Sequence, residues 1–90
     1  MVAVSNVALD TLKTAKKVIG AKQTARAVEK GLALKVYLAQ DADRRVIAPL
    51  METCRRNQIP IETGATMGEL GKACGIEVGA ASVAIVKEQQ

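Results

Sequence analysis

The stretch that decides the fold runs from Val18 to Gly31 and reads VIGAKQTARAVEKG. Two β-branched residues lead into Gly20, and a short basic helix, expected over Thr24 to Lys30, stops at the second glycine. A strand that turns through a glycine into a helix is typical of α/β proteins. The free N-terminus of such a helix carries unpaired N–H groups and partial positive charge, which suit a phosphate.

Apolar spacing on both sides of this stretch predicts the remaining elements. We expect helices over residues 4–17, 24–30, 45–57 and 67–74, and strands over 18–19, 35–39, 59–62 and 80–86. Four strands that alternate with four helices predict an α/β fold with helices on both faces of one sheet. The whole chain, residues 1–90, is then one domain with an ordered core over about residues 5–87.

Single residues refine this pattern. The nearly unbroken apolar run at 35–39 indicates a central strand, while Pro60 indicates a strand start or a sheet edge. Cys54 recurs with the apolar residues of its helix and is expected in the core. Pro49 is expected near the first turn of that helix, where its missing N–H costs little. The glycines Gly68, Gly71 and Gly75 are expected to allow close packing and to end the fourth helix.

The composition excludes several classes of function. The chain contains one aromatic residue, Tyr37, and no histidine, and its two cysteines are Cys54 and Cys74. Two thiols cannot supply the four ligands of a structural zinc site, so we expect no metal and no cofactor. No apolar run approaches the roughly 18–20 residues of a membrane span, and no signal peptide is evident. We therefore expect a cytoplasmic protein with no membrane partner.

The positive charge is concentrated in the first third of the chain. Residues 1–35 carry seven Lys or Arg against two Asp or Glu, a net of +5, whereas residues 36–90 carry six against seven, a net of −1. A one-sided field of this kind favours a polyanionic partner. The alternative is a solvated face that serves solubility, but the clustering around a glycine turn favours the polyanion.

Catalysis has little support in the sequence. Without histidine, the usual base for a Ser or Cys nucleophile is missing. Asp41 and Asp43 follow a predicted strand and could hold Mg²⁺, which would suit a small metal-dependent enzyme. A turn and a helix N-cap explain the same two residues more simply. We therefore expect a protein that is not an enzyme.

The basic cluster around the second helix suits nucleic acid better. Lys22 is expected just before the helix, and Arg26 and Lys30 lie one turn apart on one face. Gln23 adds an amide that can donate to and accept from a base edge. Because aromatic residues are nearly absent, stacking of bases on a sheet is excluded. A nucleic acid would be read by its shape and by contacts to its edges.

Four blocks of the chain together resemble the kink-turn-binding ribosomal proteins. They are GAKQTARAVEKG at 20–31, VYLAQD at 36–41, IP at 59–60 and LGKACGIEVGAA at 70–81. This superfamily includes archaeal and eukaryotic large-subunit ribosomal proteins and a core protein of small nucleolar and spliceosomal ribonucleoproteins. The chain is most similar to its small bacterial, ribosomal-protein-like members, and the resemblance extends from about Leu9 to Val86.

The resemblance implies a three-layer α-β-α sandwich with a four-stranded mixed sheet. It also implies binding to a kink-turn, an RNA duplex bent at a short bulge beside tandem sheared G·A pairs. The RNA could be ribosomal RNA, a riboswitch or the RNA of another ribonucleoprotein, and the free protein is expected to be a monomer. The implied RNA-binding residues are Gly20, Lys22, Gln23, Thr24, Arg26 and Lys30, with Ile76, Glu77, Val78, Gly79 and Ala80 in a second loop.

Two features qualify this interpretation. Lys22 and Gln23 stand where archaeal members carry Asn and Glu, so we expect a larger electrostatic share of binding. In the second loop, Ile76 and Val78 could be ordinary core or an exposed apolar tip, and the flanking glycines together with the resemblance favour the tip. The alternative function is a protein-interaction module that kept the fold without kink-turn specificity.

Overall fold

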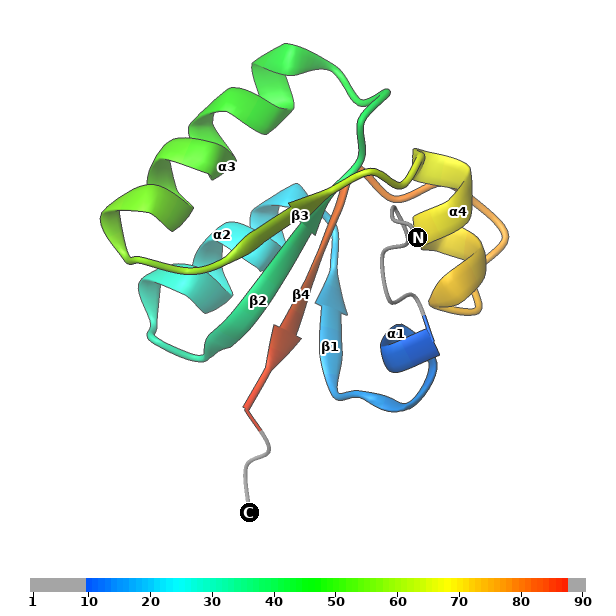
Figure 1. Ribbon diagram of the computed structural model, residues 1–90, viewed down its shortest axis with the longest axis horizontal. Helices are drawn as coiled ribbons and strands as arrows, with labels where there is room; N and C mark the ends of the chain where they lie inside the picture. Colours follow the sequence, from blue (N-terminus) through cyan, green and yellow to red (C-terminus); the bar gives the residue numbers. More distant parts are fainter. Residues whose placement is uncertain (1–9, 88–90) are drawn as a thin grey trace, which may run out of the picture.

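The computed structural model describes residues 10–87, and its elements follow the predicted alternation of helices and strands (Figure 1). They are α1 (Asp10–Thr14), β1 (Lys17–Ile19), α2 (Ala21–Glu29), β2 (Ala33–Leu38), α3 (Arg44–Arg56), β3 (Ile61–Thr63), α4 (Met67–Ala73) and β4 (Ser82–Val86). Residues 4–9 of the first expected helix and 5–9 of the expected ordered core lie outside the described residues.

The strands form one mixed sheet in the order β1-β4-β2-β3. Strand β4 pairs antiparallel with both β1 and β2, and β3 pairs parallel with β2. The interior place of β2 confirms the central strand predicted for residues 35–39, and Pro60 precedes the edge strand β3. Because Ile19 lies opposite Val83, the end of β1 meets the start of β4.

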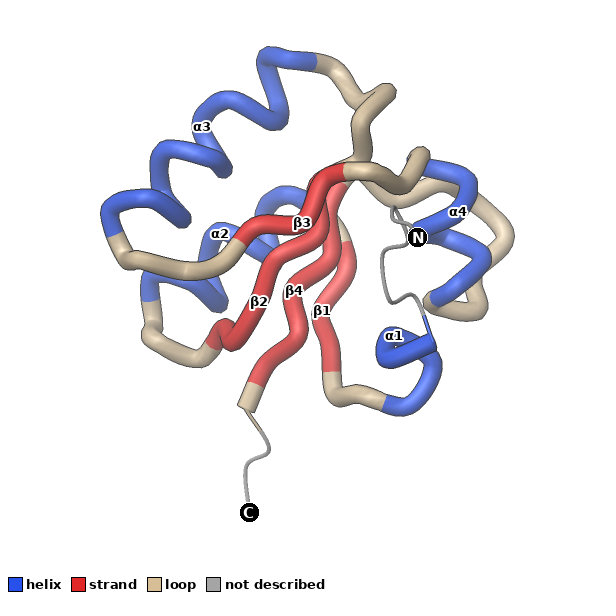
Figure 2. The backbone as a smooth tube through the Cα atoms, in the orientation of Figure 1, coloured by secondary structure: helices blue, strands red, loops and turns tan. Residues whose placement is uncertain are grey.

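Helices cover both faces of the sheet, which confirms the predicted three-layer α-β-α sandwich (Figure 2). One core packs α2 and α3 against one face, with Val36 and Leu38 of β2 and the fully buried Cys54. The other packs α1 and α4 against the opposite face, with Tyr37 of β2 and Val83 of β4. The alternation along β2 is the period of two that a strand buried on both faces requires.

Two helix boundaries differ from the prediction by more than one residue. The first helix ends at Thr14 rather than at Lys17, because Lys17 pairs with Ile85 in the sheet. The second begins at Ala21, three residues before the expected start, because Gly20 adopts φ 105° and turns the chain directly from β1 into the helix. Lys22 therefore lies inside the first turn.

Pro49 lies deeper in its helix than expected. In the 13-residue helix α3, which starts at Arg44, it occupies the second turn instead of the first. A proline there cannot donate to the carbonyl oxygen of Arg45. Both residues are exposed, so water can satisfy that oxygen and the helix continues through the proline.

Three helices end in the same way: a residue at positive φ and the residue after it each donate an N–H to a carbonyl oxygen of the last turn. Gly31 ends α2 and Gly75 ends α4, as predicted for these two glycines. At the end of α3 the same position is held by Gln58, whose φ is 58°. The Gln58 N–H donates to the carbonyl of Arg55, and the next N–H, of Ile59, donates to the carbonyl of Cys54.

We expect the substitution Gln58→Gly to stabilise the protein by about 0.5–1 kcal/mol, because only glycine adopts this backbone conformation without a steric cost. Gly31→Ala is the matched control. It places a side chain in open space at φ 75° and should destabilise by a similar amount. Urea unfolding of both variants measures the effect, and a loss of stability in Gln58→Gly would contradict it.

Candidate nucleic-acid interface

The N-terminus of α2 is held against the sheet by its backbone. The Gly20 N–H donates to the carbonyl of Ser82 at 2.9 Å, and the Thr24 N–H closes the first helical turn on the carbonyl of Gly20 at 2.9 Å. No side chain caps this terminus, and its first turn contains no acidic residue. The first N–H groups of α2 and its partial positive charge are thus left for an external acceptor.

The other helices with a described cap differ in this respect. Asp43 caps α3 by accepting from the N–H of Arg45. In α4, the side chains of Thr66 and Glu69 form a reciprocal capping box. Only α2 among the three begins without a side-chain partner, and it is the one that the resemblance assigned to RNA.

The polar and basic side chains of α2 and its C-cap form no ion pair within the described part of the chain. Lys22, Gln23 and Arg26 of α2 and the C-cap Lys30 are all exposed, and no ion pair among residues 10–87 includes one of them. Three other cations are paired, namely Lys35 with Glu62, Arg45 with Asp43 and Arg55 with Glu52, each at 3.1 Å. A phosphate could therefore bind the α2 cations without displacing an acidic neighbour.

Thr24 does not belong to this surface. Its side chain is fully buried, and its Oγ1 accepts a hydrogen bond from the Oγ of Ser82 at 3.1 Å. This contact joins α2 to the start of β4 inside the core. The direct RNA contact predicted for the Thr24 side chain does not fit its position, since the residue holds the exposed side chains of α2 in place from beneath.

The predicted residues of the second loop, between α4 and β4, fall into two groups: buried or half-buried residues at its base and exposed residues at its tip. Ile76 is half-buried against the second core, and Ala80 is buried, with its N–H donating to the carbonyl of Met67 at 3.1 Å. Val78 is 70% exposed, and Glu77 beside it is exposed too. The two interpretations of this loop thus each hold for one residue: Ile76 is core and Val78 is an exposed apolar tip.

Glycines fix the path of this loop. A Cβ on Gly71 of α4 would collide with the carbonyl oxygen of Val78, which explains the close packing predicted for that glycine. A Cβ on Gly79 would lie 3.1 Å from the Cβ of Met67. The tip therefore rests directly on the backbone of α4, and Val78 is presented from a well-packed support.

The two predicted segments converge at one end of the sheet. The loop leads into Ser82, and Ser82 bonds through its backbone to Gly20 and through its side chain to Thr24. Figure 1 shows the loop and the start of α2 on either side of the junction between β1 and β4. An uncapped basic helix start and an exposed apolar tip are thus brought together from segments about 55 residues apart in the chain.

The structure also places two lysines beside α2 that no motif of the sequence marks as part of the site. Lys16, just before β1, and Lys87, just after β4, line a pocket with Arg26 and Lys30. Lys16 belongs to the basic first third of the chain, so charge counting includes it. Lys87 follows the final strand, and only the pairing of β4 beside β1 brings it near the others.

The two carboxylates that could have bound a metal in an enzyme, Asp41 and Asp43, are both used as hydrogen-bond acceptors at helix starts. Asp43 caps α3, and hydrogen bonds from the side chain and backbone of Arg45 hold the pKa of its carboxyl below the usual value. Asp41 accepts from the N–H of Met67 at 2.8 Å and so ties the β2–α3 connection to the start of α4. Within residues 10–87, no three Asp, Glu or Cys side chains gather as a metal site would require.

The cysteines offer no activated nucleophile. Burial raises the pKa of the Cys54 thiol. Burial also raises the pKa of Cys74, although the positive charge of Lys17 opposes this shift. Both thiols are therefore protonated at neutral pH. Among the described helices, none is long and apolar enough to cross a membrane.

Comparison with known proteins gives consistent matches. The model of the ribosomal protein L7Ae/L30e/S12e/Gadd45 family matches residues 3–90. A protein of Geobacillus sp. (strain WCH70) named RNA-binding protein is 46% identical over 76 residues, which cover 84% of this chain and 93% of the relative. Another of that name, from Halalkalibacterium halodurans, is 49% identical over 70 residues, or 78% and 85% of the two chains.

A solved structure agrees with these matches. The Giardia lamblia 15.5kD RNA binding protein superimposes with a TM-score of 0.82 at 26% identity, over 90% of this chain and 72% of that one. The fold and the sequence blocks therefore lead to the same group of proteins.

We expect Asp41→Ala to lower the free energy of unfolding by about 1 kcal/mol, because it removes a carboxylate acceptor at a helix N-terminus. Asp41→Asn keeps an oxygen acceptor and should lose less. Urea unfolding distinguishes a capping role of Asp41 from a metal-binding role. If the free energy of unfolding is unchanged in both variants, Asp41 is not a cap. Addition of Mg²⁺ should stabilise neither variant nor the wild type.

Proposed function

The chain belongs to the ribosomal protein L7Ae/L30e/S12e/Gadd45 family, and we propose that it is a non-catalytic RNA-binding protein that recognises and stabilises kink-turns in structured RNA. The relatives named RNA-binding protein support the proposal that the ligand is RNA. The resemblance of the four sequence blocks supports the proposal that the RNA motif is a kink-turn. Ribosomal RNA, a riboswitch or another ribonucleoprotein RNA could carry the motif. We propose that the protein acts as a cytoplasmic monomer associated with the ribosome.

The observation that carries the proposal is the convergence of two different chemistries at one end of the sheet. The uncapped, basic start of α2 suits the phosphates and guanine edges of a widened groove. The exposed Val78 suits the apolar faces of bulged nucleotides that have left the helical stack. A kink-turn presents a groove and a bulge side by side, whereas a straight duplex presents only the groove.

The side chains of α2 divide the work of binding. Lys22 and Arg26 contribute charge, and the guanidinium of Arg26 can also bond to a guanine edge. Gln23 can both donate and accept, so its amide is suited to a sheared G·A pair. With a cation and an amide in place of the archaeal Asn and Glu, more of the affinity comes from charge and less from an acceptor carboxylate.

The mechanism is a shift of population. A free kink-turn RNA samples extended and kinked forms, and a protein that binds only the kinked form draws the equilibrium toward it. The preformed distance between the α2 start and the Val78 tip supplies the selectivity, because an extended RNA could contact only one of the two. No covalent step is needed.

We expect a duplex that contains a kink-turn to bind roughly tenfold or more tightly than the same duplex without its G·A pairs, because the protein selects one conformation. Gel-shift titration at fixed salt measures both affinities. Equal affinities would contradict the proposal. They would favour the protein-interaction module instead, particularly if the recombinant protein co-purified with a protein and without RNA.

We expect Arg26→Ala to weaken binding and to reduce the log–log salt slope by about 0.7–0.9, the contribution of one neutralised phosphate. Arg56→Ala is the matched control, because it removes the same charge from an exposed site on α3 that no ion pair among residues 10–87 includes. Titrations at four salt concentrations give the slope. An unchanged slope in Arg26→Ala would show that this residue does not contact phosphate.

A further inference from the structure

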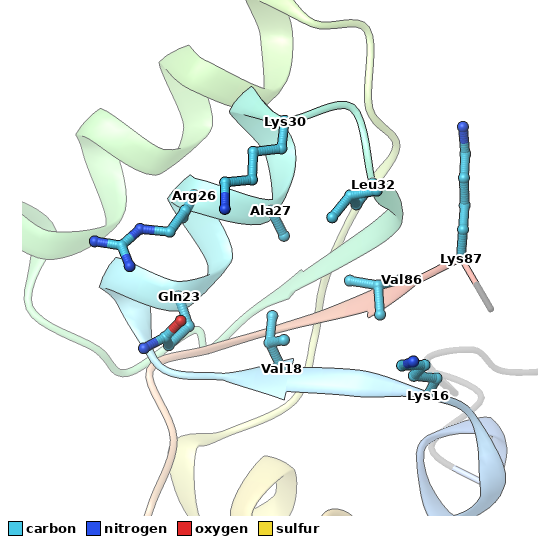
Figure 3. A pocket seen from close by; sticks show the side chains of 9 residues that line it. All are labelled: Lys16, Val18, Gln23, Arg26, Ala27, Lys30, Leu32, Val86 and Lys87. Atoms are coloured by element: carbon cyan, nitrogen blue, oxygen red, sulfur yellow. The ribbon is translucent and has the colours of Figure 1, made fainter. Parts of the chain in front are cut away.

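A pocket of about 200 Å³ lies between α2 and the edge strand β1, at the flank of α2 that faces away from α3 (Figure 3). Its wall is basic and its floor is apolar. The lining side chains are Lys16, Val18, Gln23, Arg26, Ala27, Lys30, Leu32, Val86 and Lys87. No acidic side chain is among these lining residues, so the charged part of the lining is entirely positive.

The pocket is built by the backbone of three separate segments. The Val86 N–H donates to the carbonyl of Lys16 at 3.0 Å, and the Lys87 N–H donates to the carbonyl of Leu32 at 2.9 Å. Leu32 in turn donates to the carbonyl of Ala27, as part of the turn that ends α2. The start of β1, the end of α2 and the end of β4 are thus fixed together, and their lysines surround the pocket by virtue of the fold.

The charges of this pocket are unbalanced. No ion pair within residues 10–87 includes Lys16, Arg26, Lys30 or Lys87. Like charges around one pocket repel each other, so their arrangement is more favourable when an anion is bound between them. The floor of Val18, Ala27, Leu32 and Val86 is a poor site for a free inorganic ion but suits a ligand that has both charged and apolar parts.

The pocket is continuous with the proposed kink-turn site. Gln23 and Arg26 belong to both, since they lie in the first two turns of α2 and also line the pocket. Helix α2 is nine residues long, or about 13 Å, and its C-terminal end points away from the proposed kink-turn site. Lys16 and Lys87 lie at the opposite end of β1 and β4 from Gly20. A strand of RNA that left the kink along α2 would reach them.

We propose that this pocket binds the sugar–phosphate backbone of the RNA strand that flanks the kink, and so extends the RNA footprint from α2 to Lys16 and Lys87. The lysines and Arg26 take phosphates, and the apolar floor lies under a ribose. The contact is independent of sequence, because it involves no base edge. This inference rests on the proposed function and adds a second area to the same interface.

The test compares the double variant Lys16→Gln/Lys87→Gln with the wild type on two RNAs. One is a kink-turn duplex with long stems on both sides, and the other is trimmed close to the G·A pairs. For the long RNA we expect several-fold weaker binding and a salt slope lower by about 1.4–1.8, the value for two phosphates. For the trimmed RNA, both proteins should bind alike. Trimming the stems one at a time identifies the stem that occupies the pocket.

The control variant is Arg44→Gln/Arg56→Gln, which removes the same two charges from exposed positions on α3. It should leave the difference between the two RNAs unchanged. The inference is overturned if Lys16→Gln/Lys87→Gln binds the long RNA as the wild type does, or if it loses equally on both RNAs. The proposed function fails separately, when the wild type does not distinguish a duplex with G·A pairs from one without them.

Discussion

The structure depends on the junction where β1 ends and β4 begins. There the Gly20 N–H bonds to the carbonyl of Ser82, and the Ser82 hydroxyl bonds to the hydroxyl of Thr24. Both hydroxyls are fully buried, so each would cost free energy if it lacked its partner. By satisfying each other they fix α2 on the sheet at the point where the second loop enters β4. The candidate interface exists because this junction joins the two segments.

The exposed groups of the candidate interface, which have no capping side chain and no ion pair within the described residues, lie on buried and hydrogen-bonded residues. Ser82, Thr24 and Ala80 are buried and bonded, whereas the start of α2 and the residue Val78 above them are exposed. An acidic side chain in the first turn of α2 would add stability, as Glu69 does in the first turn of α4. Helix α2 has no such residue, so the positive charge and the free N–H groups at its start are left for a ligand.

Local patterns predicted the elements, and long-range contacts decided what those patterns could not. Apolar spacing and short β-branched runs predicted all eight elements, because most of the helices and strands bury a face of their own. The buried role of Thr24 was missed, because it depends on a hydroxyl 58 residues away. A capping role was predicted for Asp41, but the helix that it serves could not be, for the same reason: its carboxylate accepts from the N–H of Met67, 26 residues away. Lys87 became part of a pocket only through the strand order of the sheet.

The uncapped start of α2 makes the candidate interface suited to an anionic ligand. A phosphate bound there would complete the helix in the way that Asp43 completes α3, by accepting from N–H groups that otherwise face water. RNA binding and stability of α2 are then coupled, since the ligand supplies the cap that the sequence lacks. The same argument explains why Gly20 cannot simply be replaced by a capping residue: at φ 105° the backbone requires glycine. The sharp turn that brings α2 to the junction thus also leaves its N-terminus open.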